Sequence, residues 1–215
     1  MRTTTTDPPA RRRTQDERRA TTESALLAAA SALVVESGVG SLTLARVGER
    51  AGYSRGIVTH HFGSKQALVD ALARHVQAGY VTGLDAMAPG LERLLALVEG
   101  YVAALAGATD ANRAFLLLWA EAASAAELTP VFVERDAGFR ADLRGDVVAG
   151  LADGTVAADV DPDDTAVAVV GQLRGIALQR LVDPGAVDPA RLARTVAVQW
   201  RRALQGPQGS SVGER

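Results

Sequence analysis

Helix start and stop signals recur along the whole chain, without the alternating runs of β-branched residues that mark strands. Ser, Thr or Asp residues that can cap a helix, and Pro residues suited to a first turn, precede most apolar segments of helical period. Gly residues follow several of these segments, as they commonly do at helix ends. The pattern predicts an all-α fold with about nine helices, over residues 15–37, 44–51, 55–61, 65–82, 90–107, 111–125, 130–152, 162–182 and 189–204.

Composition narrows the class of protein. The 215 residues are 47% hydrophobic and 22% charged, which is ordinary for a folded chain. The absence of cysteine excludes a disulfide scaffold, a thiolate metal site and a cysteine nucleophile. No segment approaches the roughly 18 consecutive apolar residues of a membrane helix, and the N-terminal residues lack the apolar core of a secretory signal. We therefore expect a cytoplasmic protein without membrane contacts.

The charges are distributed unevenly along the chain. Residues 1–82 carry 11 Lys and Arg against 7 Asp and Glu, a net charge of +4. Residues 83–215 carry 12 against 18, a net charge of −6. A basic first third on an acidic remainder suits a protein whose N-terminal part meets a polyanion.

Two short expected helices, 44–51 and 55–61, are joined by a tight turn that contains Gly52 and Ser54. This arrangement is typical of a helix-turn-helix unit, whose second helix lies in the major groove of DNA. The residues expected to reach bases or phosphates from the second helix are Ser54, Arg55, Gly56, Thr59 and His60. The residues expected to hold phosphates at helix N-termini are Thr43, Arg46 and Lys65.

Residues 42–72, LTLARVGERAGYSRGIVTHHFGSKQALVDAL, closely resemble the DNA-binding signature of the tetracycline-repressor (TetR) family of bacterial regulators. The core of the motif stands here as Ala51, Gly52, Ser54, His61, Phe62, Ser64, Lys65 and Leu68. The helices before and after it also match the family's layout, so that the resemblance covers nearly the whole chain. It implies an N-terminal three-helix DNA-binding domain followed by a helical ligand-binding and dimerisation domain.

Several positions around the motif carry separate expectations. Thr59 stands where the family commonly has Tyr, so a phosphate contact by that aromatic hydroxyl does not carry over. Gly48 replaces the more usual Ala, which is expected to loosen the packing of the two short helices. Phe62 is interpreted as a core residue and His61 as an internal hydrogen-bonding residue. Tyr53 has two open interpretations, packing or phosphate binding.

The domain organisation follows from these signals. Residues 1–13 are expected to form a disordered basic tail, whose arginines would add nonspecific affinity if they reach DNA. The helix-turn-helix domain is expected over 14–63 and the ligand-binding and dimerisation domain over 64–205. Residues 206–215, rich in Gly, Ser and Pro, are expected to form a second disordered tail.

The last two helices are the best candidates for pairing two chains. A twofold dimer presents two reading helices to a palindromic site, about one DNA turn apart. The candidate interface residues share one face of each helix: Gly171, Arg174, Gly175 and Leu178 on the penultimate helix, and Leu192, Val196 and Trp200 on the last. Packing within one chain is the alternative, and the family resemblance favours the dimer.

Aromatic residues gather in the middle of the chain, where helical spacing puts them on common faces. Two facing helices with aromatic stripes can line an apolar cavity for a small ligand, and packing in the core is the alternative left open. The candidate ligand-binding residues are the aromatic Tyr101, Phe115, Trp119, Phe132 and Phe139 and the polar Arg140 and Gln172. The expected effector is small and apolar or amphipathic.

These observations predict a homodimeric repressor that binds a palindromic operator in double-stranded DNA and is released by a small-molecule ligand. A TetR-like regulator that responds to a protein partner, or to no ligand, is the first alternative. A helical-bundle enzyme is the second, and the sequence lacks the phosphate-binding, zinc-protease and nucleophile-elbow motifs that would support it. We expect no catalytic residue, cofactor or metal; a run of aspartates at 159–164 lacks the Gly and Glu of a calcium loop.

Overall fold

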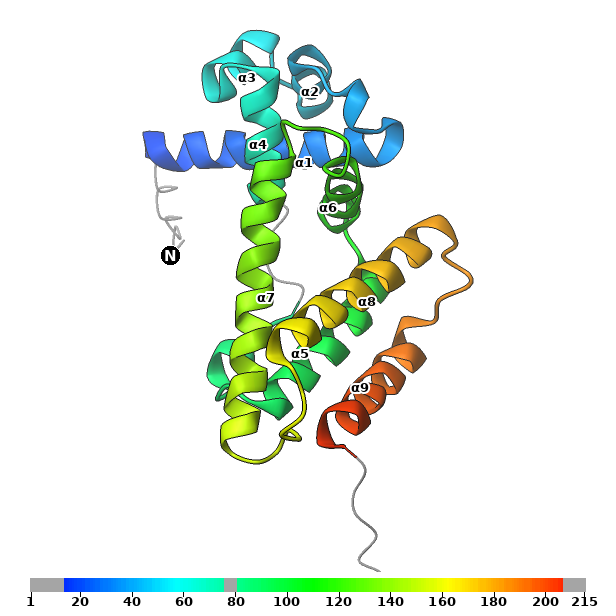
Figure 1. The fold of residues 1–215 in the computed structure, drawn as a ribbon. Coiled ribbons are helices and arrows are strands. Elements are labelled where there is room, and N and C mark those ends of the chain that lie inside the picture. The colour runs from blue at the N-terminus through cyan, green and yellow to red at the C-terminus, as the bar shows by residue number, and fades with distance from the viewer. Residues whose placement is uncertain (1–13, 76–80, 207–215) are drawn as a thin grey trace, which may run out of the picture.

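The computed structural model describes residues 14–75 and 81–206, and every regular element in these two segments is a helix (Figure 1). The α-helices are α1 (Gln15–Ser37), α2 (Leu44–Ala51), α3 (Arg55–Phe62), α4 (Lys65–His75), α5 (Leu91–Ala104), α6 (Asp110–Glu121), α7 (Thr129–Ala152), α8 (Pro162–Val182) and α9 (Pro189–Gln205). Three short 3-10 helices, η1 (Val39–Ser41), η2 (Leu84–Ala86) and η3 (Leu105–Gly107), connect them. The prediction of an all-α fold is confirmed.

Side-chain caps set most helix starts where the sequence predicts them. Thr14 and Glu17 form a reciprocal capping box at α1. Asp161 and Asp188 cap α8 and α9, each followed by a Pro in the first turn, where its missing N–H costs nothing. Because these caps satisfy N–H groups that have no partner within the helix, they fix the first residue of each helix closely.

Two predicted helix ends are wrong in the described part of the chain. The helix expected over 65–82 ends as α4 at His75, and residues 81–83 form bends; residues 76–80 lie outside the described segments. Gly83, at a φ of +85°, turns the chain into η2, a conformation that only glycine adopts without strain. The helix expected over 111–125 ends at Glu121, and a series of turns leads to α7.

Helix α1 joins the two parts of the molecule. It packs against α2 and α4 on the side of the helix-turn-helix unit and against α6 on the side of the body. In Figure 1, α2 and α3 lie on one side of α1, and the body extends from the other. Leu26, Ala30 and Val34 of α1 are fully buried and belong to one apolar core that continues through α5 to α9. The helix-turn-helix unit therefore shares one apolar core with the body.

A buried carboxylate fixes α5 against α7. Asp146 of α7 is 1% exposed, and its Oδ1 accepts hydrogen bonds from the Gly90 backbone N–H at 2.9 Å and from Arg93 Nε at 2.7 Å. Gly90 precedes α5 and has no side chain with which to cap it. Asp146 thus supplies, from another helix, the acceptor and the negative charge that a helix N-terminus favours.

Gly48 brings α2 and α3 closer together than the sequence predicts. A Cβ atom at this position would lie 2.7 Å from the Tyr53 carbonyl oxygen and 3.1 Å from Cγ2 of Val58. The expectation that Gly48 loosens this packing is therefore wrong, because the missing Cβ is what lets the turn backbone approach the helix. Gly52, with a φ of +75°, then reverses the chain in the left-handed region.

No single helix among the described residues has both the length and the hydropathy to cross a membrane. One pair does so together, Leu91–Gly107 with Asp110–Glu121, but the two members are bent by 112°.

Candidate functional site

Helix α3 projects its polar side from the surface of the helix-turn-helix unit. Val58, fully buried, and Phe62, half-buried against the core, hold the opposite side of the helix in place. Phe62 is therefore the core residue that the sequence predicts. The predicted DNA-binding residues are all exposed: Thr43, Arg46, Ser54, Arg55, Gly56, Thr59, His60 and Lys65.

Three of these residues use their hydroxyl groups in hydrogen bonds to the backbone of α2 or α3. Thr43 Oγ1 accepts a hydrogen bond from the Arg46 backbone N–H at 3.2 Å, which caps α2. Ser54 Oγ accepts one from the Ile57 backbone N–H at 3.3 Å, which caps α3. Thr59 Oγ1 donates to the Arg55 carbonyl oxygen at 3.0 Å. The two caps fix where α2 and α3 begin, and the first residues of α3 are exposed, so that the positive end of its dipole faces the surroundings.

Two of the residues predicted to bind phosphate, Arg46 and Lys65, donate hydrogen bonds to the 3-10 helix η1. Arg46 Nη1 donates to the Ser41 carbonyl oxygen at 3.0 Å, and Lys65 Nζ donates to the Gly40 carbonyl oxygen at 3.4 Å. Both cations therefore lie beside the same loop, although they come from different helices. A further bidentate pair between Arg50 and Glu36 joins α2 to α1, and its hydrogen bonds lower the pKa of the Glu36 carboxyl.

The positions of three residues near α3 bear on the sequence interpretation. His61 is half-buried, but its Nδ1 has no hydrogen-bond partner among the described residues, so the predicted internal hydrogen bond is not made at this atom. Tyr53 is half-buried against the core, which favours the packing interpretation. Ile57 is 39% exposed on α3 and is not among the residues predicted to face DNA. Its neighbour Val58 takes the buried face, and adjacent helical residues point about 100° apart.

The structure brings most of the predicted ligand-binding aromatics together in the body. Phe115 and Phe132 are buried with ring centroids 5.7 Å apart, and Tyr101 is 3% exposed. Trp119 and Phe139 are half-buried beside them. We call Tyr101, Phe115, Trp119 and Phe139 the aromatic cage because they surround a single cation, the guanidinium of Arg174.

The predicted dimer interface is wrong at Arg174, because this residue is buried within its own chain. It is 3% exposed and lies on the inner side of α8, not on the outer stripe with Gly171. Its Cζ atom lies 4.3 Å from the ring centroid of Phe115, 5.8 Å from those of Trp119 and Phe139, and 6.0 Å from that of Tyr101. Rings at these distances attract a cation through their quadrupoles, which explains why the charge faces inward.

Hydrogen bonds tie the cage to Asp136. Arg174 Nη1 donates to the Tyr101 hydroxyl at 3.0 Å, and Trp119 Nε1 donates to Asp136 Oδ2 at 2.7 Å. Arg174 Nη2 and Asp136 Oδ1 form a looser ion pair at 3.5 Å. Burial raises the pKa of the Tyr101 hydroxyl, and the positive charge of Arg174 works against that increase. The phenol is therefore neutral and accepts the hydrogen bond.

A small cavity of about 230 Å³ adjoins the cage and is lined by Trp119 of the cage and by its partner Asp136. Its other lining residues are Ala122, Ala123, Thr129, Phe132, Val133 and Arg140. Arg140 thus lies where the sequence places a polar ligand-binding residue. Gln172 does not: its Oε1 accepts a hydrogen bond from Trp200 Nε1 at 2.6 Å, which makes it part of the α8–α9 contact.

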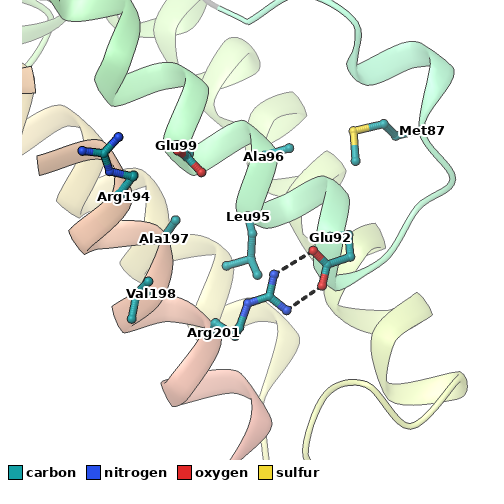
Figure 2. A pocket seen from close by; sticks show the side chains of 9 residues that line it. All are labelled: Met87, Glu92, Leu95, Ala96, Glu99, Arg194, Ala197, Val198 and Arg201. Atoms are coloured by element: carbon teal, nitrogen blue, oxygen red, sulfur yellow. Dashed lines mark hydrogen bonds and ion pairs between the residues drawn. The ribbon is translucent and has the colours of Figure 1, made fainter. Parts of the chain in front are cut away.

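A second cavity, of about 400 Å³, lies between α5 and α9 (Figure 2). A bidentate pair between Glu92 and Arg201, at 2.6 and 2.7 Å, closes one end of it, and Arg201 lowers the pKa of the Glu92 carboxyl. Glu99 and Arg194 lie further along the groove, where Figure 2 shows no dashed interaction between them. The groove contains none of the predicted aromatic residues.

The outer face of α8 is apolar and uncovered. Val167 is 58% exposed and Val182 is 85% exposed, and the exposed Gly171 lies between them. Gly175 and Leu178 of α8, and Leu192 and Trp200 of α9, are partly exposed, as an interface would require. Val196 is not available, since it is 2% exposed and packs within its own chain.

Among the described residues, no group of three or more His, Asp or Glu side chains is placed to hold a metal ion.

Residues 90–205 match the model of the BetI-type transcriptional repressor C-terminal region, and residues 26–72 match that of the tetR family of bacterial regulatory proteins. The HTH-type transcriptional regulator BetI of Burkholderia thailandensis is 51% identical over 41 residues, which are 19% of this chain. That matched segment spans 21% of the length of the curated relative.

Solved structures share the fold at low sequence identity. NalD, the secondary repressor of the MexAB-OprM multidrug efflux pump in Pseudomonas aeruginosa, superposes with a TM-score of 0.70 and 22% identity, over 88% of this chain and 98% of NalD. A protein from Saccharomonospora viridis, solved in complex with choline, superposes with a TM-score of 0.71 and 17% identity, over 86% of this chain and 98% of that protein.

The family models together cover both the helix-turn-helix unit and more than half of the chain. Their members regulate transcription and are not enzymes, in agreement with an exposed reading helix on a helical body. The chain belongs to the TetR family of bacterial regulatory proteins and carries a C-terminal region of the BetI repressor type.

Proposed function

We propose that two copies of this chain bind a palindromic operator and repress transcription until a small effector releases them. The observation that carries this proposal is α3, an eight-residue helix whose polar side is exposed while Val58 holds its other side in the core. Such a helix fits the major groove, which admits one α-helix.

The exposed side of α3 offers two kinds of base contact. Arg55, at the first position of the helix, can donate two hydrogen bonds to O6 and N7 of a guanine. Ile57 adds an apolar surface of the kind that packs against a thymine methyl group. Gly56 lets the backbone come close to the DNA. Arg46 and Lys65 would exchange their carbonyl partners in η1 for phosphate oxygens, which are stronger acceptors for a cation.

Dimerisation is supported by the outer face of α8. A stripe that exposes Val167, Gly171 and Val182 to water is more stable when another apolar surface covers it. Gly171 and Gly175 leave room for a second helix to approach closely, since no neighbouring atom lies within 4 Å of the place that a Cβ would take at either. Two such helices related by a twofold axis would form the centre of a four-helix bundle with the two α9 helices.

Effector binding is proposed at the aromatic cage and its adjoining cavity. The cage residues lie on α5, α6 and α7 and enclose Arg174 of α8; α6 packs against α1, which also contacts α2 and α4 of the helix-turn-helix unit. Neighbours of the same fold were solved with choline and with triclosan, so that this architecture accommodates small ligands of different charge. A ligand changes operator affinity only through its different affinity for the two states of the dimer.

A gel-shift experiment with the DNA upstream of this gene tests the proposal. We expect a saturable complex on a fragment that contains an inverted repeat, at a stoichiometry of two chains per repeat. The Arg55→Ala variant should lose this complex while keeping weak binding to unrelated DNA. Equal binding of the wild-type chain to all duplexes, or a chain that stays monomeric on the bound fragment, would contradict it.

A further inference from the structure

The aromatic cage is already occupied by a cation of the chain itself. Four rings surround the Arg174 guanidinium at 4.3–6.0 Å, the geometry with which proteins recognise ammonium ligands. The side chain is fixed there by a hydrogen bond to Tyr101 and by an ion pair to Asp136. A cationic ligand would have to displace a buried charge that the fold holds in place, which makes the site unfavourable for cations.

The charges around the cage are not balanced. Arg135 also lies over Phe115, with its Cζ 4.0 Å from the ring centroid, so two guanidinium groups share this ring. Asp136 is the carboxylate that contacts the cage, and Trp119 already binds its Oδ2. Arg140 adds a third guanidinium at the adjoining cavity. Among the described residues, Arg174 and Arg140 together outnumber the carboxylate of Asp136 at the cage and its cavity, which favours the entry of a negative charge.

Arg174 also lacks a partner that a ligand could supply. Its Nε is buried and has no hydrogen-bond acceptor among the described residues. Water cannot readily replace the missing acceptor, because the residue is only 3% exposed. A buried donor without an acceptor is destabilising, and more so when it carries charge. An incoming anionic oxygen would remove this cost, whereas an apolar ligand would leave it.

We propose that the effector is an organic anion, a carboxylate with a flat apolar body, that binds Arg174 through the cavity beside Trp119 and Asp136. This inference rests on the proposed function, because it specifies the ligand class of the same site. The apolar body would occupy the cavity of about 230 Å³ between Trp119 and Phe132. Arg174 does not line this cavity, so the carboxylate would pass between Trp119 and Asp136 to accept a hydrogen bond from the unpartnered Nε of Arg174. Arg174 would then act as a selector that admits anions and rejects cations.

Tryptophan fluorescence can test this selection directly, because the chain has two tryptophans and one belongs to the cage. The Trp200→Phe variant leaves Trp119 as the only reporter. The probes are benzoate, benzylammonium and benzyl alcohol, which share a ring and differ in charge. We expect benzoate to change the Trp119 emission saturably and the other two to bind at least about tenfold more weakly, the factor that one charge-assisted hydrogen bond provides.

Substitution of Arg174 should invert the preference. In the Trp200→Phe background, Arg174→Met keeps the length of the side chain and removes its charge, so benzoate should bind at least about tenfold more weakly. Benzylammonium should now bind more tightly than it does with Arg174 intact, because the cage no longer contains a positive charge and Asp136 attracts the ammonium group. Arg174→Lys retains a charge in the cage and serves if the Met variant does not fold by circular dichroism; it should keep the preference for benzoate. Arg201→Met, at the α5–α9 groove, is the matched control and should change nothing.

The outcomes separate this inference from the proposed function. Binding of benzylammonium as tightly as benzoate while Arg174 is intact, or failure of benzoate to perturb Trp119, overturns the inference even if operator binding is normal. Saturable benzoate binding that depends on Arg174 supports it. If benzoate binds in this way but gel shifts show the same operator affinity with and without it, the anion site stands and the effector role in the proposed function is refuted.

Discussion

Replacing Gly48 by Ala tests the close approach of α2 and α3. In an open helix this change stabilises by about 1 kcal/mol, because Ala has the higher helix propensity. At Gly48 the added Cβ would lie 2.7 Å from the Tyr53 carbonyl oxygen and 3.1 Å from Val58 Cγ2. The first contact is with backbone in the turn that positions α3, so relief requires the two helices to separate. Overpacking of this kind costs about 1–3 kcal/mol.

Gly138→Ala is the matched control, since Gly138 lies inside α7 and no neighbouring atom comes within 4 Å of the position that an added methyl group would take. The propensity gain is common to both variants, so their difference isolates the overpacking cost. We expect Gly138→Ala to be more stable than Gly48→Ala by about 1–3 kcal/mol in urea unfolding at one fixed protein concentration. Operator affinity should fall only in Gly48→Ala. Equal stability of the two variants would refute the close approach.

Three further predictions concern the reading helix, the interface and the α5–α7 contact. Arg55→Ala should cost about 1–3 kcal/mol on the cognate operator in a gel shift, and an equal loss on random DNA would show a phosphate contact instead. Val167→Asp should weaken dimerisation at least about tenfold in analytical ultracentrifugation, because two carboxylates would face the apolar seam; Val148→Asp, on the exposed side of α7, should not. Asp146→Asn should lower the free energy of unfolding by about 1–3 kcal/mol in denaturant, because Arg93 loses its buried charge partner, and unchanged stability would contradict that role.

The sequence predicts helix starts better than helix ends. Caps such as Asp161 and Asp188 act through bonds within three residues, so local sequence contains what is needed to place them. The sequence places the end of α4 too late, at residue 82, because the apolar pattern does not reveal the bends that residues 81–83 form. Packing and turns decide such ends, and neither is visible in a short window.

The candidate site shows the same limit. Exposure of the α3 residues follows from one local fact, the burial of Val58 and Phe62 on the opposite side. Sequence spacing could not show whether Arg174 points into the core or out of it. The residue lies only about 60° around the helix from Gly171, at the edge of the apolar stripe. What turns it inward is Tyr101, 73 residues earlier in the chain. Likewise, a Gly in place of Ala suggests looser packing until the position of the Tyr53 carbonyl is known.

Helix α1 has a mechanical consequence for the molecule. Its 23 residues span about 34 Å at the rise of an α-helix. It packs against α6 of the body and against α2 and α4 of the helix-turn-helix unit, so that a movement of α6 can be passed to that unit through one rigid rod. A tilt of about 5° displaces the far end of such a rod by about 3 Å, close to the spacing of consecutive base pairs. An angular change too small to disturb the core is therefore enough to put two half-sites out of register.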